Sequence, residues 1–132
     1  MRSKICVFIC AFFCSICLLA GCAQENLLSK MKKIVPIFEG AQVLESKIPS
    51  EKMSIIMMEV EVSKAAQKEI LDFYKDAMTK QGFELKKFKD YGKNGSIMEL
   101  VKEDVGMLSV ATIMKKTQKT GKIPVTLNLE FK

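Results

Sequence analysis

Cysteine is the residue type in this sequence with the clearest capacity for chemistry, because thiolates ligate soft metals and act as nucleophiles. Four of the five cysteines, Cys6, Cys10, Cys14 and Cys17, are spaced to fall on one face of a helix. They lie within an uncharged apolar stretch of the kind that enters a membrane. Thiolates that bind a metal must instead lie outside lipid. We therefore interpret these four as small apolar residues, and only Cys22 remains as a candidate for modification.

Acidic pairs and adjacent methionines are the other candidates for a site. Glu59 and Glu61 occupy one face of an alternating segment, and Glu103 and Asp104 lie in a predicted turn. General acid–base catalysis needs a desolvated carboxyl group, but exposed acids on an amphipathic strand are ordinary. Met57 and Met58 are neighbours on a predicted strand, so their thioethers point to opposite faces and cannot share a metal ion. We predict no metal and no cofactor.

Composition excludes several kinds of protein. The 132 residues include no His and no Trp, and the formal charge is +6. Without His there is no Ser-His-Asp triad, no Cys–His pair and no imidazole ligand for a metal. The basic charge comes from Lys, with one Arg at position 2, whereas base recognition in nucleic acids relies heavily on Arg. We expect neither an enzyme nor a nucleic-acid-binding protein.

The first residues have the pattern of a signal peptide. Arg2 and Lys4 precede an apolar stretch over 5–19, which is followed by the small residues Ala20 and Gly21. This stretch is shorter than the roughly 20 residues that a membrane span needs. A short positive segment, an apolar segment and small residues at a cleavage site are typical of secretion.

The residues at the end of this segment resemble the lipobox of bacterial lipoproteins. Leu19-Ala20-Gly21-Cys22 matches that motif at all four positions. The resemblance implies that the Cys22 sulfur receives a diacylglyceryl group and that signal peptidase II cuts before Cys22. It also implies a further acyl chain on the new amino group, and two or more chains anchor a protein stably. Residues 1–21 would then be removed.

The resemblance also implies a location in the bacterial cell envelope. Ala23 follows the cysteine, and in Gram-negative lipoproteins an Asp at this position favours retention in the inner membrane. We therefore expect the outer membrane, facing the periplasm, in a Gram-negative cell. In a Gram-positive cell the protein would lie on the outer face of its membrane.

Residues 22–36 are predicted to form a lipidated tether and a short amphipathic helix. Its apolar residues recur at helical spacing, at Leu27, Leu28, Met31, Ile34 and Val35. The opposite face carries Lys30, Lys32 and Lys33. Two interpretations remain open. The lysines could contact anionic lipid head groups, or the helix could simply pack on the following domain.

Residues 37–132 are predicted to form a single α+β domain. Alternation and turn signals indicate an antiparallel sheet of five or six strands, at 42–48, 53–62, 83–91, 96–102, 107–115 and 123–132. One long amphipathic helix, with Ser63 as N-cap and Gly82 as the glycine after its end, separates the second and third strands. The predicted order is ββαββββ, with the helix covering one face of the sheet.

Lysines crowd two parts of the predicted domain, at Lys80, Lys86, Lys87, Lys89 and Lys93, and at Lys115, Lys116, Lys119 and Lys122. Lysine on an exposed strand discourages edge-to-edge pairing, and it also attracts anionic surfaces.

Two classes of function follow from these features. We predict a non-catalytic binding or accessory module that holds an anionic lipid or an envelope protein. In general plan the domain resembles small uncharacterised envelope lipoproteins. The alternative is a small ligand carrier or enzyme that uses the sheet face opposite the helix.

Overall fold

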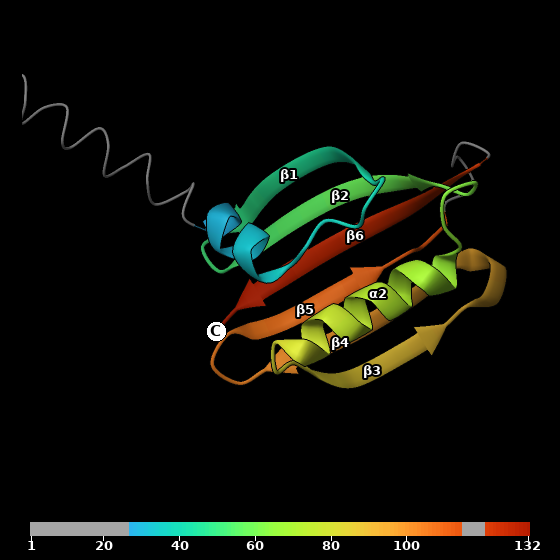
Figure 1. Ribbon diagram of the computed structural model, residues 1–132. Helices are drawn as coiled ribbons and strands as arrows, with labels where there is room; N and C mark the ends of the chain where they lie inside the picture. The colour runs from blue at the N-terminus through green and yellow to red at the C-terminus, as the bar shows by residue number, and fades with distance from the viewer. Residues whose placement is uncertain (1–26, 115–120) are drawn as a thin grey trace, which may run out of the picture.

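The computed structural model describes residues 27–114 and 121–132 (Figure 1). The predicted signal peptide, the lipobox residues Leu19, Ala20, Gly21 and Cys22, and the start of the tether lie outside these ranges. The strands are β1 (Gln42–Ser50), β2 (Met53–Glu61), β3 (Glu84–Asp90), β4 (Ser96–Lys102), β5 (Gly106–Ala111) and β6 (Lys122–Phe131). A 14-residue helix, α2 (Gln67–Lys80), lies between β2 and β3, and a short 3-10 turn, η1 (Gly92–Asn94), links β3 to β4.

All six strands form one antiparallel sheet in the order β1-β2-β6-β5-β4-β3. The last strand in the chain, β6, lies between β2 and β5 and joins the β1–β2 hairpin to the β3–β4–β5 meander. The predicted α+β class and the antiparallel sheet are therefore confirmed. We expected five or six strands, and the sheet has six. β1 and β3 are the two edge strands.

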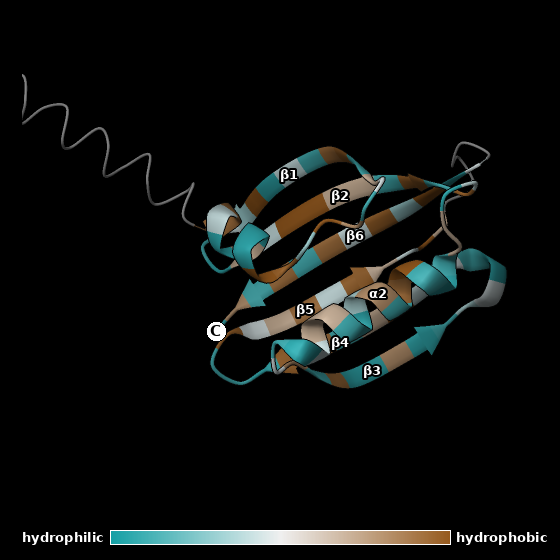
Figure 2. Ribbon diagram, viewed as in Figure 1, coloured by the Kyte–Doolittle hydropathy of each residue, from teal (hydrophilic) through white to brown (hydrophobic). Residues whose placement is uncertain are grey.

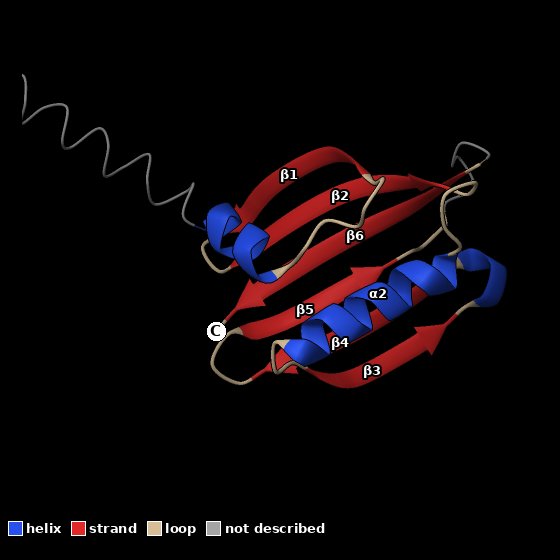
Figure 3. Ribbon diagram, viewed as in Figure 1, coloured by secondary structure: helices blue, strands red, loops and turns tan. Residues whose placement is uncertain are grey.

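The prediction of one long helix is wrong, because the described residues contain two α-helices. Residues 27–34 form a short helix ahead of β1, so the element order begins with a helix and differs from the predicted ββαββββ. Figure 3 shows both helices on the same side of the sheet. The short helix is part of the fold because its apolar side chains enter the core: Met31 and Val35 are both fully buried.

Helix α2 also begins later than predicted. The N–H groups of Lys64 and Ala65 both donate to the Glu61 carbonyl oxygen, at 2.9 and 3.3 Å, so Ser63 lies inside a turn. Ala66 is extended and acts as the N-cap without a side-chain hydrogen bond. The end of the helix is as predicted: Gly82 has a φ of +95°, and this left-handed conformation closes a Schellman motif.

The core lies between the two helices and one face of the sheet. Strand alternation buries Ile56, Met58 and Val60 from β2, whereas Val62, the last residue of the predicted strand, is 53% exposed beyond the end of β2. The central strand β6 contributes Val125, Leu127 and Leu129, and α2 contributes Ile70, Leu71, Tyr74 and Met78. The hydropathy colouring in Figure 2 shows this apolar alternation along the central strands.

The opposite sheet face carries the alternate residues, which are mostly half-buried in β2, β6, β5 and β4 and exposed in the edge strands β1 and β3. No α-helix of the described ranges covers that face (Figure 3). None of the helices in residues 27–114 and 121–132 is long and apolar enough to cross a membrane.

Candidate binding groove

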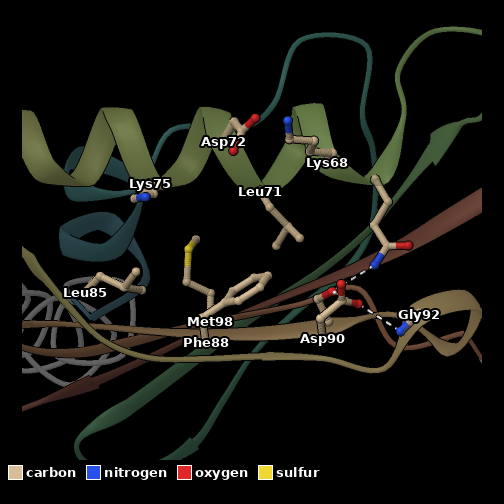
Figure 4. Close-up of a pocket in the computed structure, with 11 residues that line it drawn as sticks. Lys68, Leu71, Asp72, Lys75, Leu85, Phe88, Asp90, Gly92 and Met98 are labelled. Carbon is tan, nitrogen blue, oxygen red and sulfur yellow. Dashed lines mark hydrogen bonds between the residues drawn. The ribbon is translucent and has the colours of Figure 1, made fainter.

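A groove of about 560 Å³ lies between α2 and the β3–β4 hairpin, on the helix side of the sheet (Figure 4). We call it the α2–β3 groove. It is lined by Gln67, Lys68, Leu71, Asp72, Lys75, Leu85, Phe88, Asp90, Gly92, Ser96 and Met98. The groove lies where α2 approaches both β4 and the edge strand β3.

The floor of the groove is apolar. Leu71 from α2 and Met98 from β4 are buried, whereas Leu85 and Phe88 from β3 are 39% and 52% exposed. Figure 4 shows Leu71 pointing from the helix toward Phe88 and Met98 on the sheet. Large apolar side chains that stay exposed beside an apolar floor are typical of a binding site, because a ligand that covers them removes that area from water.

A β-bulge explains why both exposed side chains reach the groove. Residues three apart on a regular strand face opposite sides, yet Leu85 and Phe88 both line the groove. The pairing of β3 with β4 shifts register between Leu85 and Lys87, so Lys86 is the extra residue that restores a common side. The Lys86 ammonium lies 2.9 Å from a Glu84 carboxylate oxygen and lowers the pKa of that carboxyl group.

The other end of the groove is polar and tied by hydrogen bonds. An Asp90 carboxylate oxygen, Oδ1, accepts from the Gly92 N–H at 2.8 Å and from the Ser96 hydroxyl at 3.2 Å. Gln67 Nε2 donates to the same hydroxyl at 3.1 Å, which joins the first turn of α2 to the β3–β4 hairpin (Figure 4). These contacts fix the acceptor groups of Asp90 and Gln67 at one end of an apolar floor.

Ser96 itself is held by the neighbouring Thr112. The Ser96 N–H donates to the Thr112 hydroxyl at 3.2 Å, and the Thr112 N–H donates to the Ser96 carbonyl oxygen at 2.9 Å. This close approach needs Gly95, whose φ is +112°, because a Cβ there would lie 2.1 Å from the Thr112 carbonyl oxygen. Gly95 therefore sets the polar end of the groove.

The rim formed by α2 is charged. Lys68, Asp72 and Lys75 recur at helical spacing, are exposed to solvent, and line the groove above its apolar floor. The amphipathic pattern of the helix puts these three residues on the arc opposite its apolar stripe, as the structure shows. The sequence did not reveal the groove, because nothing in the lysine-rich strand marks the bulge that brings Leu85 and Phe88 to one side.

The lysines predicted for membrane contact lie on the short helix. Lys30, Lys32 and Lys33 are all exposed, while Met31 on the opposite face is fully buried. The apolar face of this helix is therefore used by the protein core, and its lysine face is directed to solvent. The residues predicted to form a lipobox, Cys22 included, are outside the described ranges.

The acidic and methionine candidates are not brought together into a site. Glu59 lies 3.1 Å from the Lys122 ammonium, and Glu61 lies 4.0 Å from that of Lys64. Met58 is buried in the core, whereas Met57 is half-buried on the opposite face. Within residues 27–114 and 121–132, no three Cys, Asp or Glu side chains gather in a group that could hold a metal ion.

The groove and the alternative ligand site that we considered lie on opposite sides of the sheet. The ligand-carrier alternative places its site on the face away from the helix, whereas the α2–β3 groove opens beside α2. Comparisons of the chain with protein-family models, with curated proteins and with solved structures find no match.

Proposed function

We propose that this protein is a lipid-anchored, extracytoplasmic binding module of the bacterial cell envelope, and that its binding site is the α2–β3 groove. One observation carries the choice of site: Leu85 and Phe88 are exposed over an apolar floor, next to a hydrogen-bonded polar end. Binding sites commonly combine an apolar surface with a few fixed polar groups, which set the orientation of the ligand.

The side chains of the groove support binding without catalysis. Its polar groups are a carboxylate and an amide that are already held by Ser96 and Gly92. The chain has no His, and no Cys lines the groove. Nucleophilic or acid–base catalysis requires an activated group beside the reacting bond, and a fixed acceptor over an apolar floor instead favours recognition.

The anchor places the short helix close to the membrane. Leu27 is the fifth residue after Cys22, and an extended chain over these five steps spans at most about 17 Å. Lys30, Lys32 and Lys33 are therefore near the lipid head groups once Cys22 is acylated. Each lysine at an anionic surface adds roughly 1 kcal/mol of attraction, so anionic lipid is a second partner of the anchored protein.

Acylation is tested by replacing Cys22 with Ala in cells that are fed labelled palmitate. We expect no label in the protein and accumulation of a slower-migrating precursor, because the diacylglyceryl group is attached to the Cys22 thiol and cleavage follows this attachment. Cys17→Ala is the control and keeps label and normal processing. A Cys22→Ala protein of mature size, or one that still takes up label, would contradict the anchor.

The groove is tested with the fluorescent probe anilinonaphthalene sulfonate, which brightens on apolar surfaces. Phe88→Ser removes an exposed side chain from the groove and should reduce the fluorescence of the bound probe. Val62→Ser removes a similarly exposed apolar side chain outside the groove and should leave the signal unchanged. Equal fluorescence of the two variants would exclude the α2–β3 groove as an apolar binding site.

A further inference from the structure

We propose that the partner of the α2–β3 groove is an extended polypeptide segment in which apolar and acidic side chains alternate. The segment adds to the sheet as a new strand along the outer edge of β3. This inference rests on the proposed function of the groove and specifies the chemistry of its ligand.

The backbone of β3 offers the first argument. Among the described strands β3 pairs with β4 alone, so one side of β3 is a free edge. Such an edge presents alternate N–H and C=O groups without strand partners, which an extended peptide can satisfy. From Lys87 to Asp90 the pairing with β4 is regular, so this part of β3 has the regular strand geometry with which an added strand can pair.

The groove offers the second argument. Neighbouring strands lie about 4.8 Å apart, so a strand added to β3 has one of its faces directly beside the Phe88 side chain. That face points toward the space between β3 and α2, where Leu71 and Leu85 complete the apolar lining. Every second side chain of the added segment would enter the groove, and an apolar side chain there would cover the exposed ring of Phe88.

Charge offers the third argument, on the other face of the same strand. Lys87 and Lys89 alternate with Phe88 and therefore face away from the groove. Both are exposed, and the Lys89 ammonium lies 5.2 Å from the centre of the Tyr91 ring. The remaining side chains of the added segment would lie beside these two cations, where opposite charges across a strand pair are favourable.

The other sheet edge is a poorer template. The pairing of β1 with β2 is irregular at two places, between Val43 and Glu45 and between Lys47 and Ser50. β3 has one such break, at Lys86, and its pairing with β4 is regular from Lys87 to Asp90. Lysines on β3 also discourage pairing with a second copy of this basic strand, so the same residues that prevent self-association select an acidic segment.

The test uses a fluorescein-labelled nine-residue peptide of alternating valine and glutamate, with the full-length chain in detergent micelles. We expect saturable binding by fluorescence anisotropy and slower hydrogen exchange of the β3 amides. Phe88→Ser should weaken binding about tenfold, because the peptide loses its largest apolar contact. The same peptide methylated on every backbone nitrogen should not bind, since it cannot pair with an edge.

Charge is tested by an exchange of signs. The double variant Lys87→Glu/Lys89→Glu should bind the peptide about tenfold more weakly at low salt and should gain binding to a valine–lysine peptide. Lys30→Glu/Lys32→Glu makes the same change of net charge on the short helix and should leave binding unchanged. An equal loss of peptide binding in both double variants would show that net charge alone causes the effect. That result would overturn the assignment of the peptide site to the edge of β3.

The outcomes separate this inference from the proposed function. Absence of peptide binding up to millimolar concentration, or unchanged binding of the methylated peptide, would overturn strand addition. If the anilinonaphthalene probe still reports the groove in that case, the groove remains a binding site and its ligand is not a polypeptide strand. If the probe also fails to distinguish Phe88→Ser, the groove itself is excluded.

Discussion

The hydroxyl of Tyr74 on α2 donates a 3.0 Å hydrogen bond to the carbonyl oxygen of Pro36. The same hydroxyl accepts from the Phe38 N–H at 3.2 Å. Tyr74 is fully buried, so both bonds are shielded from water. Gln81 Nε2 donates to the Ile34 carbonyl oxygen as well. Helix α2 therefore holds the short helix and the loop that leads into β1 through two separate side chains.

Tyr74→Phe should destabilise the protein by about 1–3 kcal/mol, because it leaves two partly buried backbone groups without their shared partner. The free energy of unfolding in urea measures this loss. Tyr91→Phe is the matched control, since Tyr91 is 42% exposed, and a change within about 0.5 kcal/mol is expected there. Equal stability of the two variants would show that the Tyr74 hydroxyl does not hold the N-terminal segment.

Alkaline pH should destabilise the protein through the same residue. Burial raises the pKa of the Tyr74 hydroxyl above its ordinary value of about 10, and the Phe38 N–H bond only partly opposes this. Because the folded-state pKa is the higher one, the stabilisation is complete below pH 10 and is lost as the pH rises further. The unfolding free energy measured between pH 9 and 11 should fall more steeply in wild type than in Tyr74→Phe. Parallel curves would contradict the burial of a neutral hydroxyl.

Met31→Ala should cost about 2–5 kcal/mol, because it empties a fully buried position where the short helix meets the core. Lys32→Ala changes the neighbouring exposed residue and should change stability by less than about 0.5 kcal/mol. Thermal unfolding of both variants provides the comparison. A mild effect at Met31 would mean that the short helix is a detachable part of the tether.

Gly95→Ala should damage the polar end of the groove, because a Cβ there would collide with the Thr112 backbone at a positive φ. Gly92→Ala is the control: its φ is +63°, and nothing lies within 4 Å of a Cβ at that position. We expect lower stability and disturbed NMR signals of Ser96 in Gly95→Ala. In Gly92→Ala we expect a loss of about 1 kcal/mol and unchanged Ser96 signals. A larger loss of stability in Gly92→Ala than in Gly95→Ala would contradict this packing argument.

Replacing all three lysines of the short helix, Lys30, Lys32 and Lys33, by Gln should weaken the binding of the unlipidated protein to anionic vesicles. At roughly 1 kcal/mol for each lysine, the loss is large at low salt and shrinks as salt screens the charges. The control variant carries the same three changes at Lys86, Lys87 and Lys93. Vesicle sedimentation measures the binding of both triple variants. Equal losses of binding would show that the attraction depends on net charge and not on the short helix.

The strands were predictable because the alternation of buried and exposed positions appears in the sequence as alternating apolar and polar residues. Ile56, Met58 and Val60 in β2, and Val125, Leu127 and Leu129 in β6, alternate with polar or half-buried residues, and all six are buried as expected. The end of α2 was predictable too, because Gly82 supplies a backbone conformation that few other residues adopt.

The start of α2 and the groove were not predictable by the same reasoning. Ser63 is a favourable N-cap, but the chain first turns at Glu61 to leave the sheet, and the helix begins only at Gln67. The groove depends on the bulge at Lys86, which places Leu85 and Phe88 on one side. The three-residue spacing of Leu85 and Phe88 in a lysine-rich strand was the available signal, but regular alternation would place residues at that spacing on opposite faces.

The central position of β6 has a consequence for the order in which the chain folds. The β1–β2 hairpin and the β3–β4–β5 meander form from neighbouring segments, and among the described strands only β6 hydrogen-bonds to both. A chain that emerges N-terminus first, from a ribosome or through a translocation pore, cannot unite these two parts until the ten residues of β6 arrive. Completion of the sheet is therefore a long-range event, and the hairpin and the meander stay apart until β6 is delivered.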